Sequence, residues 1–352
     1  MRPKGVAGIL HGGGDRLFQR ISSGFGRLKF FEDGVGNLRE HEAWISSLKD
    51  GPVAAPHAIE IKWTDWRENR LLGFAWREGV FLSPSAVSLN LPESCHRARF
   101  AFLEPESWMK RSEDAVLILA GTGDHGYLFR TLNLAAPLLR AGVSVIILEN
   151  AMYGKRKPAF QTGSKLRKVS DLLALGRVTI EESRSLLEFL RTEPSTSGER
   201  ALAVMGCSMG GLHAAMSASL MNDPIGVVAA FAPPNADVAF VKGIMNKTMS
   251  ANILPSLDSV LYATDIRNFP RKNFPAVLIS GNSDLYVPAE HSVNTWRSHW
   301  PSIDVRFVNS GHLSGMVLNR HVIASSAIDV LRAVTTCTSN TVNHRQEDAT
   351  LV

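Results

Sequence analysis

Residues 204–216 read VMGCSMGGLHAAM and place Ser208 between two glycines, with a third glycine following. The pentapeptide GCSMG matches G-x-S-x-G, a pattern that can hold a nucleophilic serine on a sharp turn between a strand and a helix. The same residues also fit an ordinary core segment rich in alanine and glycine. Because so short a motif occurs by chance in many chains, its meaning depends on the rest of the sequence.

Composition is that of an ordinary globular protein. The chain has 352 residues, of which 45% are hydrophobic and 20% are charged, so it can bury a large core. The net charge of +5 is a mild basic excess, but the cations are scattered and we expect no nucleic-acid partner. The three cysteines, at 95, 207 and 337, form no C-x-x-C pair. The sequence therefore predicts neither a metal site nor a disulfide framework, which favours a reducing compartment.

The first thirty residues carry six cations against a single acid, Asp15. A helix over 16–29 would place apolar side chains on one face and arginines on another. Such a helix is typical of a presequence or of a membrane-surface segment, which leaves peripheral membrane contact open, but it could equally pack on its own domain. The apolar run VAGIL is too short for a signal peptide. We therefore expect an intracellular protein, mitochondrial if the helix is an address and otherwise cytoplasmic.

Strands and helices are predicted to alternate along the chain. An antiparallel hairpin, IEIKW (59–63) with RLLGFAW (70–76), comes first. Uninterrupted apolar strands follow, at 116–120, 143–148, 201–205, 225–231, 276–280 and 304–308. Helices are expected near 127–140, 177–191, 209–221, 289–299 and 320–334. This order indicates an α/β fold with a mostly parallel central sheet and helices on both of its faces.

The predicted domain organisation has three parts. Residues 1–57 form a basic, amphipathic N-terminal extension, 58–335 the α/β domain, and 336–352 a polar, disordered tail. Between two of the strands an apolar, methionine-rich segment, about 235–272, is inserted. We predict a helical lid there, covering an acyl-chain pocket, with ordinary helix packing as the alternative.

A second glycine loop, GTGDHG at 121–126, follows a predicted strand and precedes a predicted helix. With Glu149 at the end of the next strand, this is the setting of a dinucleotide-binding loop, in which the acid binds the ribose hydroxyls. The competing prediction makes the loop part of an oxyanion hole, where backbone N–H groups stabilise a negatively charged oxygen. The donors would then be Met209, directly after the serine, and Thr122 or Gly123.

A nucleophilic serine needs a histidine to take its proton and an acid to orient that histidine. In the α/β-hydrolase fold both follow later strands, in the chain order Ser, Asp, His. Asp284 follows the predicted strand AVLIS, and His312 lies in a glycine-flanked loop after DVRFV. The sequence therefore predicts a triad of Ser208, Asp284 and His312 on an α/β-hydrolase fold. Asp237 is a reserve acid, and His213 is expected to pack in the core.

Six stretches resemble the α/β-hydrolase domain-containing protein 18 family: LAGTGDH (119–125), LENAMYGKRKPAFQTGS (148–164), VSDL (169–172), GCSMGG (206–211), GNSDLYVP (281–288) and GHLSG (311–315). The resemblance implies that Ser208, Asp284 and His312 are the nucleophile, the acid and the base. It also implies a lipid acyl-ester hydrolase, with cardiolipin deacylation at the mitochondrion as the family's proposed activity. Where the family loop reads ENPYYG, this chain has ENAMYG.

Three consecutive cations follow a predicted strand at the sheet edge where ligands bind in open α/β folds. The cations are Lys155, Arg156 and Lys157. We predict that they hold the anionic headgroup of a phospholipid, and the alternative is an ordinary solvated loop.

These patterns together predict a serine hydrolase that cleaves acyl esters of lipids through an acyl-enzyme, without metal or organic cofactor. Three alternatives stay open. The same residues could transfer the acyl group to an acceptor other than water, GTGDHG could serve a nicotinamide-dependent oxidoreductase, or the fold could be a catalytically inactive scaffold.

Overall fold

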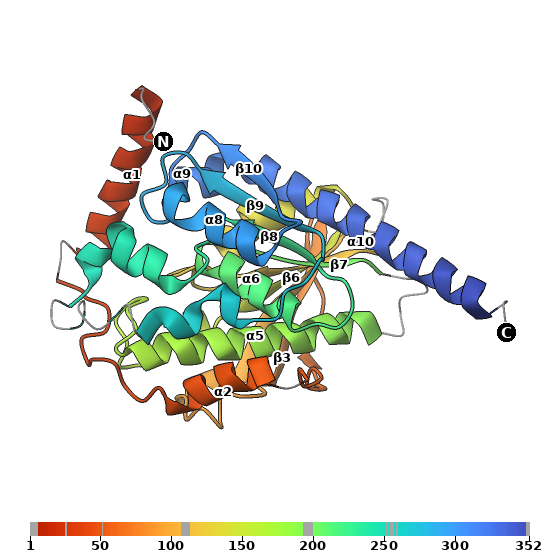
Figure 1. Cartoon of the computed structure of the whole chain (residues 1–352), viewed down its shortest axis with the longest axis horizontal. Helices are drawn as coiled ribbons and strands as arrows, with labels where there is room; N and C mark the ends of the chain where they lie inside the picture. The colour runs from red at the N-terminus through yellow and green to blue at the C-terminus, as the bar shows by residue number, and fades with distance from the viewer. Residues whose placement is uncertain are drawn as a thin grey trace.

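The computed structural model describes residues 6–24, 27–50, 52–106, 113–192, 200–250, 253, 257 and 260–349. Its strands are β1 (Lys62–Trp63), β2 (Arg67–Asn69), β3 (Phe74–Leu82), β4 (Arg97–Pro105), β5 (Ala115–Leu119), β6 (Ser144–Glu149), β7 (Leu202–Cys207), β8 (Gly226–Ala230), β9 (Ala276–Gly281) and β10 (Asp304–Val308). Its helices are α1 (Val6–Ser22), α2 (Arg39–Asp50), α3 (Leu128–Arg130), α4 (Ala136–Arg140), α5 (Val169–Thr192), α6 (Met209–Ser219), α8 (Ala289–His299), α9 (His312–Leu318) and α10 (Arg320–Ala349) (Figure 1).

The strands form a sheet in the order β1-β3-β4-β6-β5-β7-β8-β9-β10, with β2 paired to β3. The six strands from β6 to β10 in this order run parallel, which confirms the predicted mostly parallel sheet. The antiparallel end differs from prediction, because the main partner of β3 is β4, a strand that the sequence analysis missed. The predicted first hairpin strand is reduced to the two residues of β1.

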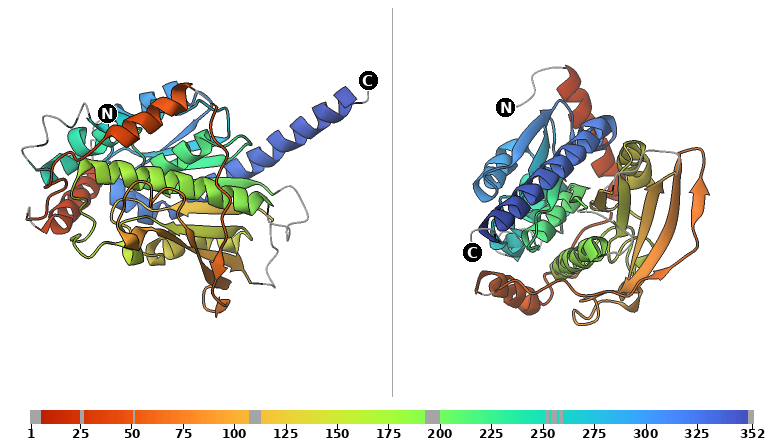
Figure 2. Two further views of the ribbon diagram at one scale, coloured as in Figure 1. Left: turned by 90° about the horizontal axis from the view of Figure 1, so that it is seen from below. Right: turned by 90° about the vertical axis from the view of Figure 1, so that its right-hand side faces the viewer.

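Both faces of the sheet are buried, which explains why its strands read as continuous apolar runs. Leu117 and Leu119 of β5 pack in one core with α5, α6 and α8, whereas Val116 and Ile118 pack in a second core with α4 and α10. Successive residues of a strand point to opposite faces, so a strand covered on both sides has no polar row. The helices therefore lie on both faces, as predicted (Figures 1 and 2).

The segment between β8 and β9 packs against the N-terminal part of the chain. Short helical turns cover Val238–Lys242, Ile244–Thr248, Leu261–Thr264 and Ile266–Asn268, and most of 251–259 lies outside the described residues. The backbone N–H of Phe30 donates to Thr248 O at 2.9 Å, and the Phe30 and Phe240 rings meet edge to face. The predicted lid and the predicted extension thus share one apolar cluster.

Both terminal helices differ from the sequence-based expectation. Helix α1 covers Val6–Ser22 rather than 16–29, since Gly24 adopts a left-handed φ of 53°, which a right-handed helix cannot continue through. Helix α10 continues to Ala349, although 336–352 was predicted to be a disordered tail. Residues 336–349 contain neither glycine nor proline, so no helix-ending signal interrupts the helix begun at Arg320. Figure 2 shows α10 extending beyond the rest of the fold.

Candidate active site

Ser208 lies on the turn between β7 and α6, with φ 56° and ψ −128°. A positive φ is rare for a residue with a side chain and costs on the order of 1–3 kcal/mol, so the surroundings must hold it. They do so through close backbone packing. A Cβ atom on Gly206 would lie 2.4 Å from the carbonyl carbon of Gly210, and one on Gly210 would lie 2.6 Å from Leu119 O. Glycine at these positions lets the turn form.

The predicted acid and base meet beyond the ends of β9 and β10. Asp284 follows β9, His312 begins α9 after β10, and His312 Nδ1 lies 2.7 Å from Asp284 Oδ2. The other oxygen, Asp284 Oδ1, accepts the backbone N–H groups of Tyr286 and Val287, both at 2.8 Å. The Tyr286 ring stacks on the imidazole at 4.9 Å between centroids. Both ends of this pair are therefore fixed in place.

Electrostatics at the pair favour the protonated form of His312. Burial by itself lowers the pKa of His312, but the charge of Asp284, its hydrogen bond and the charge of Asp15 outweigh burial and raise that pKa. Burial raises the pKa of the Asp284 carboxyl, while His312 and the backbone N–H of Val287 act in the opposite direction. A base with a raised pKa holds a proton taken from a hydroxyl more firmly.

Asp15 of α1 also contacts this pair, and the sequence analysis did not predict it as a site residue. Its carboxylate accepts backbone N–H groups from Leu285 at 3.2 Å, His312 at 3.0 Å and Leu313 at 3.2 Å. The side chain is completely buried. One signal was present in the sequence, since Asp15 is the single acid among six cations in the first thirty residues.

The GTGDHG loop lies against the turn that carries Ser208. A Cβ atom on Gly121 would lie 3.0 Å from Cys207 O, and the Thr122 hydroxyl donates to Met209 Sδ at 3.6 Å. Met209 is the first residue of α6, where backbone N–H groups lack partners within the helix. Thr122 and Met209 line one small cavity together with Ser208.

The side chains of Asp124 and His125 in that loop contact other parts of the fold. Asp124 Oδ2 lies 2.8 Å from Nε of the buried Arg130, and His125 Nδ1 accepts the backbone N–H of Gly154 at 2.9 Å. Glu149, the predicted ribose ligand of the dinucleotide alternative, is buried and accepts the backbone N–H of Lys155 at 3.2 Å. These contacts disfavour the dinucleotide alternative.

Two other polar residues considered from the sequence lie apart from the base. Asp237, the reserve acid, forms an ion pair with Lys242 at 2.8 Å, whereas Asp284 contacts His312. His213 is buried in α6, and burial lowers its pKa to about 4, so it stays neutral. It packs beside Gly176, where a Cβ atom would lie 3.2 Å from its Nε2.

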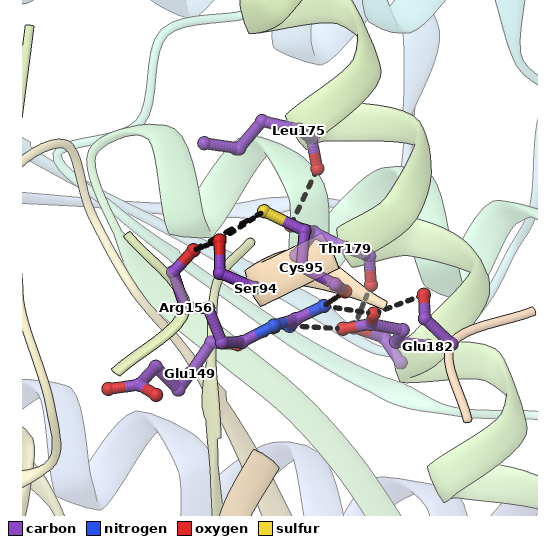
Figure 3. Close-up of polar contacts among 9 residues, drawn as sticks. Ser94, Cys95, Glu149, Arg156, Leu175, Thr179 and Glu182 are labelled. Carbon is purple, nitrogen blue, oxygen red and sulfur yellow. Dashed lines mark hydrogen bonds and ion pairs between the residues drawn. The ribbon is translucent and has the colours of Figure 1, made fainter. Parts of the chain in front are cut away.

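The three predicted headgroup ligands do not act as a group. Arg156 is completely buried and forms a two-pronged ion pair with Glu182 at 2.6 and 2.8 Å (Figure 3). It also donates to Cys95 O and Glu149 O. The prediction for Arg156 is therefore wrong, because the side chain is buried and both of its terminal nitrogens donate inside the fold. Lys155 Nζ pairs with Glu78 at 3.3 Å, and Lys157 Nζ donates to Gln161 O.

A cavity of about 640 Å³ opens beside Ser208 and lies within the range of small-molecule sites. Its lining includes both predicted triad members that would contact substrate, the glycine loop and several apolar side chains: Ser208, His312, Thr122, Gly123, Phe18, Leu28, Phe129, Met245 and Met316. A second, smaller cavity of about 60 Å³ shares Ser208 and Met245 and is lined by Phe240 of the predicted lid. Within the described part of the chain, no cluster of three or more His, Cys, Asp or Glu side chains could hold a metal ion.

A parallel sheet flanked by helices, with a serine on a strained strand-to-helix turn and an Asp–His pair after later strands, defines an α/β hydrolase. The chain belongs to the family "Alpha/beta hydrolase domain containing 18", which matches residues 16–258 and 256–333.

Solved structures share the fold at low sequence identity. The esterase Pf2001 of Pyrococcus furiosus superposes with a TM-score of 0.53 at 16% identity, over 80% of this chain and 99% of that one. An acetyl xylan esterase from Paenibacillus sp. R4 gives 0.52 at 14% identity, over 83% and 97%. At such identities the likeness establishes the fold.

Proposed function

We propose that this chain is a serine hydrolase that cleaves acyl esters of lipids through Ser208, His312 and Asp284. His312 Nε2 takes the hydroxyl proton as Ser208 Oγ attacks the ester carbonyl, and the backbone N–H groups of Met209 and Thr122 stabilise the oxyanion. Collapse of the tetrahedral intermediate expels the alcohol, which takes the proton from His312. Water, deprotonated by the same histidine, then attacks the acyl-enzyme. His312 returns this proton to the departing Ser208 Oγ as the fatty acid is released.

One observation carries this proposal. The strained Ser208 and the His312–Asp284 pair, joined at 2.7 Å, come from three strand ends, and Ser208 and His312 border one cavity. A purely structural role would not require a positive φ at a serine, which by itself disfavours the folded state by about 1–3 kcal/mol.

The lining of the cavity supports a lipid as the substrate class. Apolar side chains from α1, the glycine loop region and the predicted lid surround the polar centre at Ser208. The lining is more apolar than polar, which suits an acyl chain. An acyl ester of a phospholipid is therefore our proposed substrate, with cardiolipin as the first to test.

Helix α1 supports contact with an anionic phospholipid surface. Its outward side chains Leu10, Leu17, Phe18 and Ile21 are exposed, and Phe18 also lines the cavity. The exposed charges of this helix are Arg16 and Arg20, both positive. Apolar side chains beside cations favour insertion at the surface of an anionic bilayer. No described helix is long and apolar enough to cross a membrane.

Fluorophosphonate labelling tests the nucleophile. Wild-type protein should react, and Ser208→Ala should not, with ester hydrolysis falling by at least about 10³-fold. Labelling that persists in Ser208→Ala would refute the assignment of Ser208. Product analysis with cardiolipin vesicles should then find free fatty acid, whereas an acylated acceptor would identify a transferase instead.

Vesicle binding tests the lipid surface. The wild-type chain should bind cardiolipin-containing vesicles more tightly than phosphatidylcholine vesicles, and Leu17→Ser with Ile21→Ser should lose most of that binding. Equal binding by the wild-type chain and the double variant would refute the role of α1.

We also propose a mitochondrial location, because cardiolipin, the first substrate to test, is a mitochondrial lipid in this proposal. Imaging of the full chain with a C-terminal tag tests the location.

A further inference from the structure

Asp15 is separated by 270 and 297 residues from the backbone groups of Leu285 and His312 that it binds. It is the only acid of helix α1, and its side chain is completely buried. A buried carboxylate is costly unless hydrogen bonds replace its lost water. Here three backbone N–H groups fulfil that requirement, and all three belong to the segments that carry the predicted acid and base.

One carboxylate joins two loops. Leu285 directly follows Asp284, whereas His312 and Leu313 begin α9. The first N–H groups of a helix have no partner within the helix, so an acceptor from elsewhere in the fold fixes its start. Asp15 thereby sets the position of the loop that carries Asp284 relative to the start of α9, which carries His312.

The packing around Asp15 leaves little room for movement. A Cβ atom on Gly311 would lie 2.9 Å from Asp15 Oδ2 and 3.0 Å from His11 O. On helix α1 itself, a Cβ atom on Gly12 would lie 3.5 Å from Cδ1 of Leu285, the residue after Asp284. Helix α1 therefore meets both loops at close range, next to α9 as Figure 1 shows.

We propose that Asp15 is a positioning residue for the Asp284–His312 pair, which makes helix α1 part of the active site. The inference rests on the proposed function of that pair. Asp15 touches neither Ser208 nor substrate in this proposal. It acts by holding two backbone segments, and a shift of the imidazole by about 1 Å can reduce turnover by about 100-fold.

The charge of Asp15 provides a second, separable effect. Asp284, Asp15 and Tyr286 are the titratable groups that the described elements place against His312. Burial raises the pKa of Tyr286, so its hydroxyl stays neutral. A negative charge at Asp15 stabilises the imidazolium and helps to raise the pKa of His312. Removal of that charge should therefore lower the pKa of His312.

Asp15→Asn tests the proposal, because the amide keeps the shape of the side chain but removes its charge and half of its acceptors. We expect kcat on a soluble ester to fall by about 10- to 100-fold, with KM changed by less than about threefold. The acid limb of the pH–rate profile should move to lower pH. The matched control is Asp33→Asn, which removes an acid that pairs with Arg167 at the surface and should leave kcat and the profile unchanged.

A folded Asp15→Asn variant with wild-type kcat and an unshifted acid limb would overturn the proposal. Gly311→Ala gives an independent variant, since the added methyl group must displace Asp15, and it should also lower kcat more than it raises KM. The pKa of His312, followed by NMR in ¹³C-histidine-labelled protein, needs no activity. If the wild-type chain is inactive, the proposed function fails, and a lower pKa of His312 in Asp15→Asn still decides whether Asp15 acts on the imidazole.

Discussion

The Nδ1 atom of His312 lies 2.7 Å from Oδ2 of Asp284, and both side chains are buried. This contact fixes the tautomer, because a neutral imidazole that donates from Nδ1 has its lone pair at Nε2, the atom needed to accept a proton. In the proposed mechanism, Asp284 thus orients His312 and stabilises the cation that forms on proton transfer.

Loss of the acid should therefore cost much of the activity. Asp284→Asn should lower kcat by about 10³- to 10⁴-fold, because the amide can donate to Nδ1 and stabilise the wrong tautomer. Steady-state ester hydrolysis measures this. Asp237→Asn is the control, since Asp237 pairs with Lys242, and its kcat should stay within about threefold of wild type. The reverse ranking of the two variants would move the acid to Asp237.

Activity should fall as the pH drops through the pKa of His312. The base must be neutral to accept the serine proton, and the contacts with Asp284 and Asp15 raise its pKa above the usual 6.5. A raised pKa extends the inactive range upward, so the acid limb of kcat/KM should have its midpoint above about 6.5. A midpoint near 4, the value to which burial lowers the pKa of His213, would contradict this environment.

Added volume at the turn that carries Ser208 should lower the stability of the fold. Gly210→Ala would bring a methyl group to 2.6 Å from Leu119 O and 2.8 Å from Ala120 O, both backbone atoms. We expect the free energy of unfolding to fall by about 1–3 kcal/mol, together with a loss of labelling at Ser208. Gly13→Ala is the control, because nothing lies within 4 Å and the site is helical, so it should stabilise by about 0.5–1 kcal/mol. Urea unfolding compares the two.

The buried ion pair should matter for stability rather than for headgroup binding. Arg156→Met should reduce the free energy of unfolding by about 3–5 kcal/mol, because it leaves the Glu182 carboxylate buried without its cation. Lys155→Met removes a largely exposed cation and should cost less than about 1 kcal/mol. The double variant Arg156→Met with Glu182→Leu should recover most of the loss. A folded Arg156→Met protein that loses only phospholipid affinity would restore the headgroup role.

Met245 should influence which acyl chains are hydrolysed, since it lines both cavities beside Ser208. Met245→Trp should lower kcat/KM for long-chain esters by about tenfold or more, while acetyl esters, which do not reach the lining, should change little. Met245→Ala enlarges the space and should lack this effect. Equal losses on short and long esters in Met245→Trp would instead indicate damage to the turn at Ser208.

Much of the fold was predictable because local patterns and burial agree. The parallel strands were found from their apolar runs. Helix α8 and strand β10 have the predicted limits, since Pro288 and Pro301 flank the helix and Asn309-Ser310-Gly311 follow the strand. Strand β4 was missed because it carries Arg97, Arg99 and Glu104 among its apolar residues, so it does not read as an uninterrupted apolar run. Its two neighbours in the sheet, β3 and β6, are far from each other in sequence, and β4 is buried only when it pairs with both of them.

The sequence by itself determined the chemistry that was available: a serine between glycines, followed by an acid and a histidine in the order of the fold. These choices are local, because the residue types and the strand ends can be seen in short stretches. Tertiary structure decided which groups are free to act. It buried Arg156 against Glu182, and it brought Asp15 across 297 residues to His312. Contacts between distant segments leave no periodic signal in the chain, and they form only when burial of the apolar faces brings those segments together.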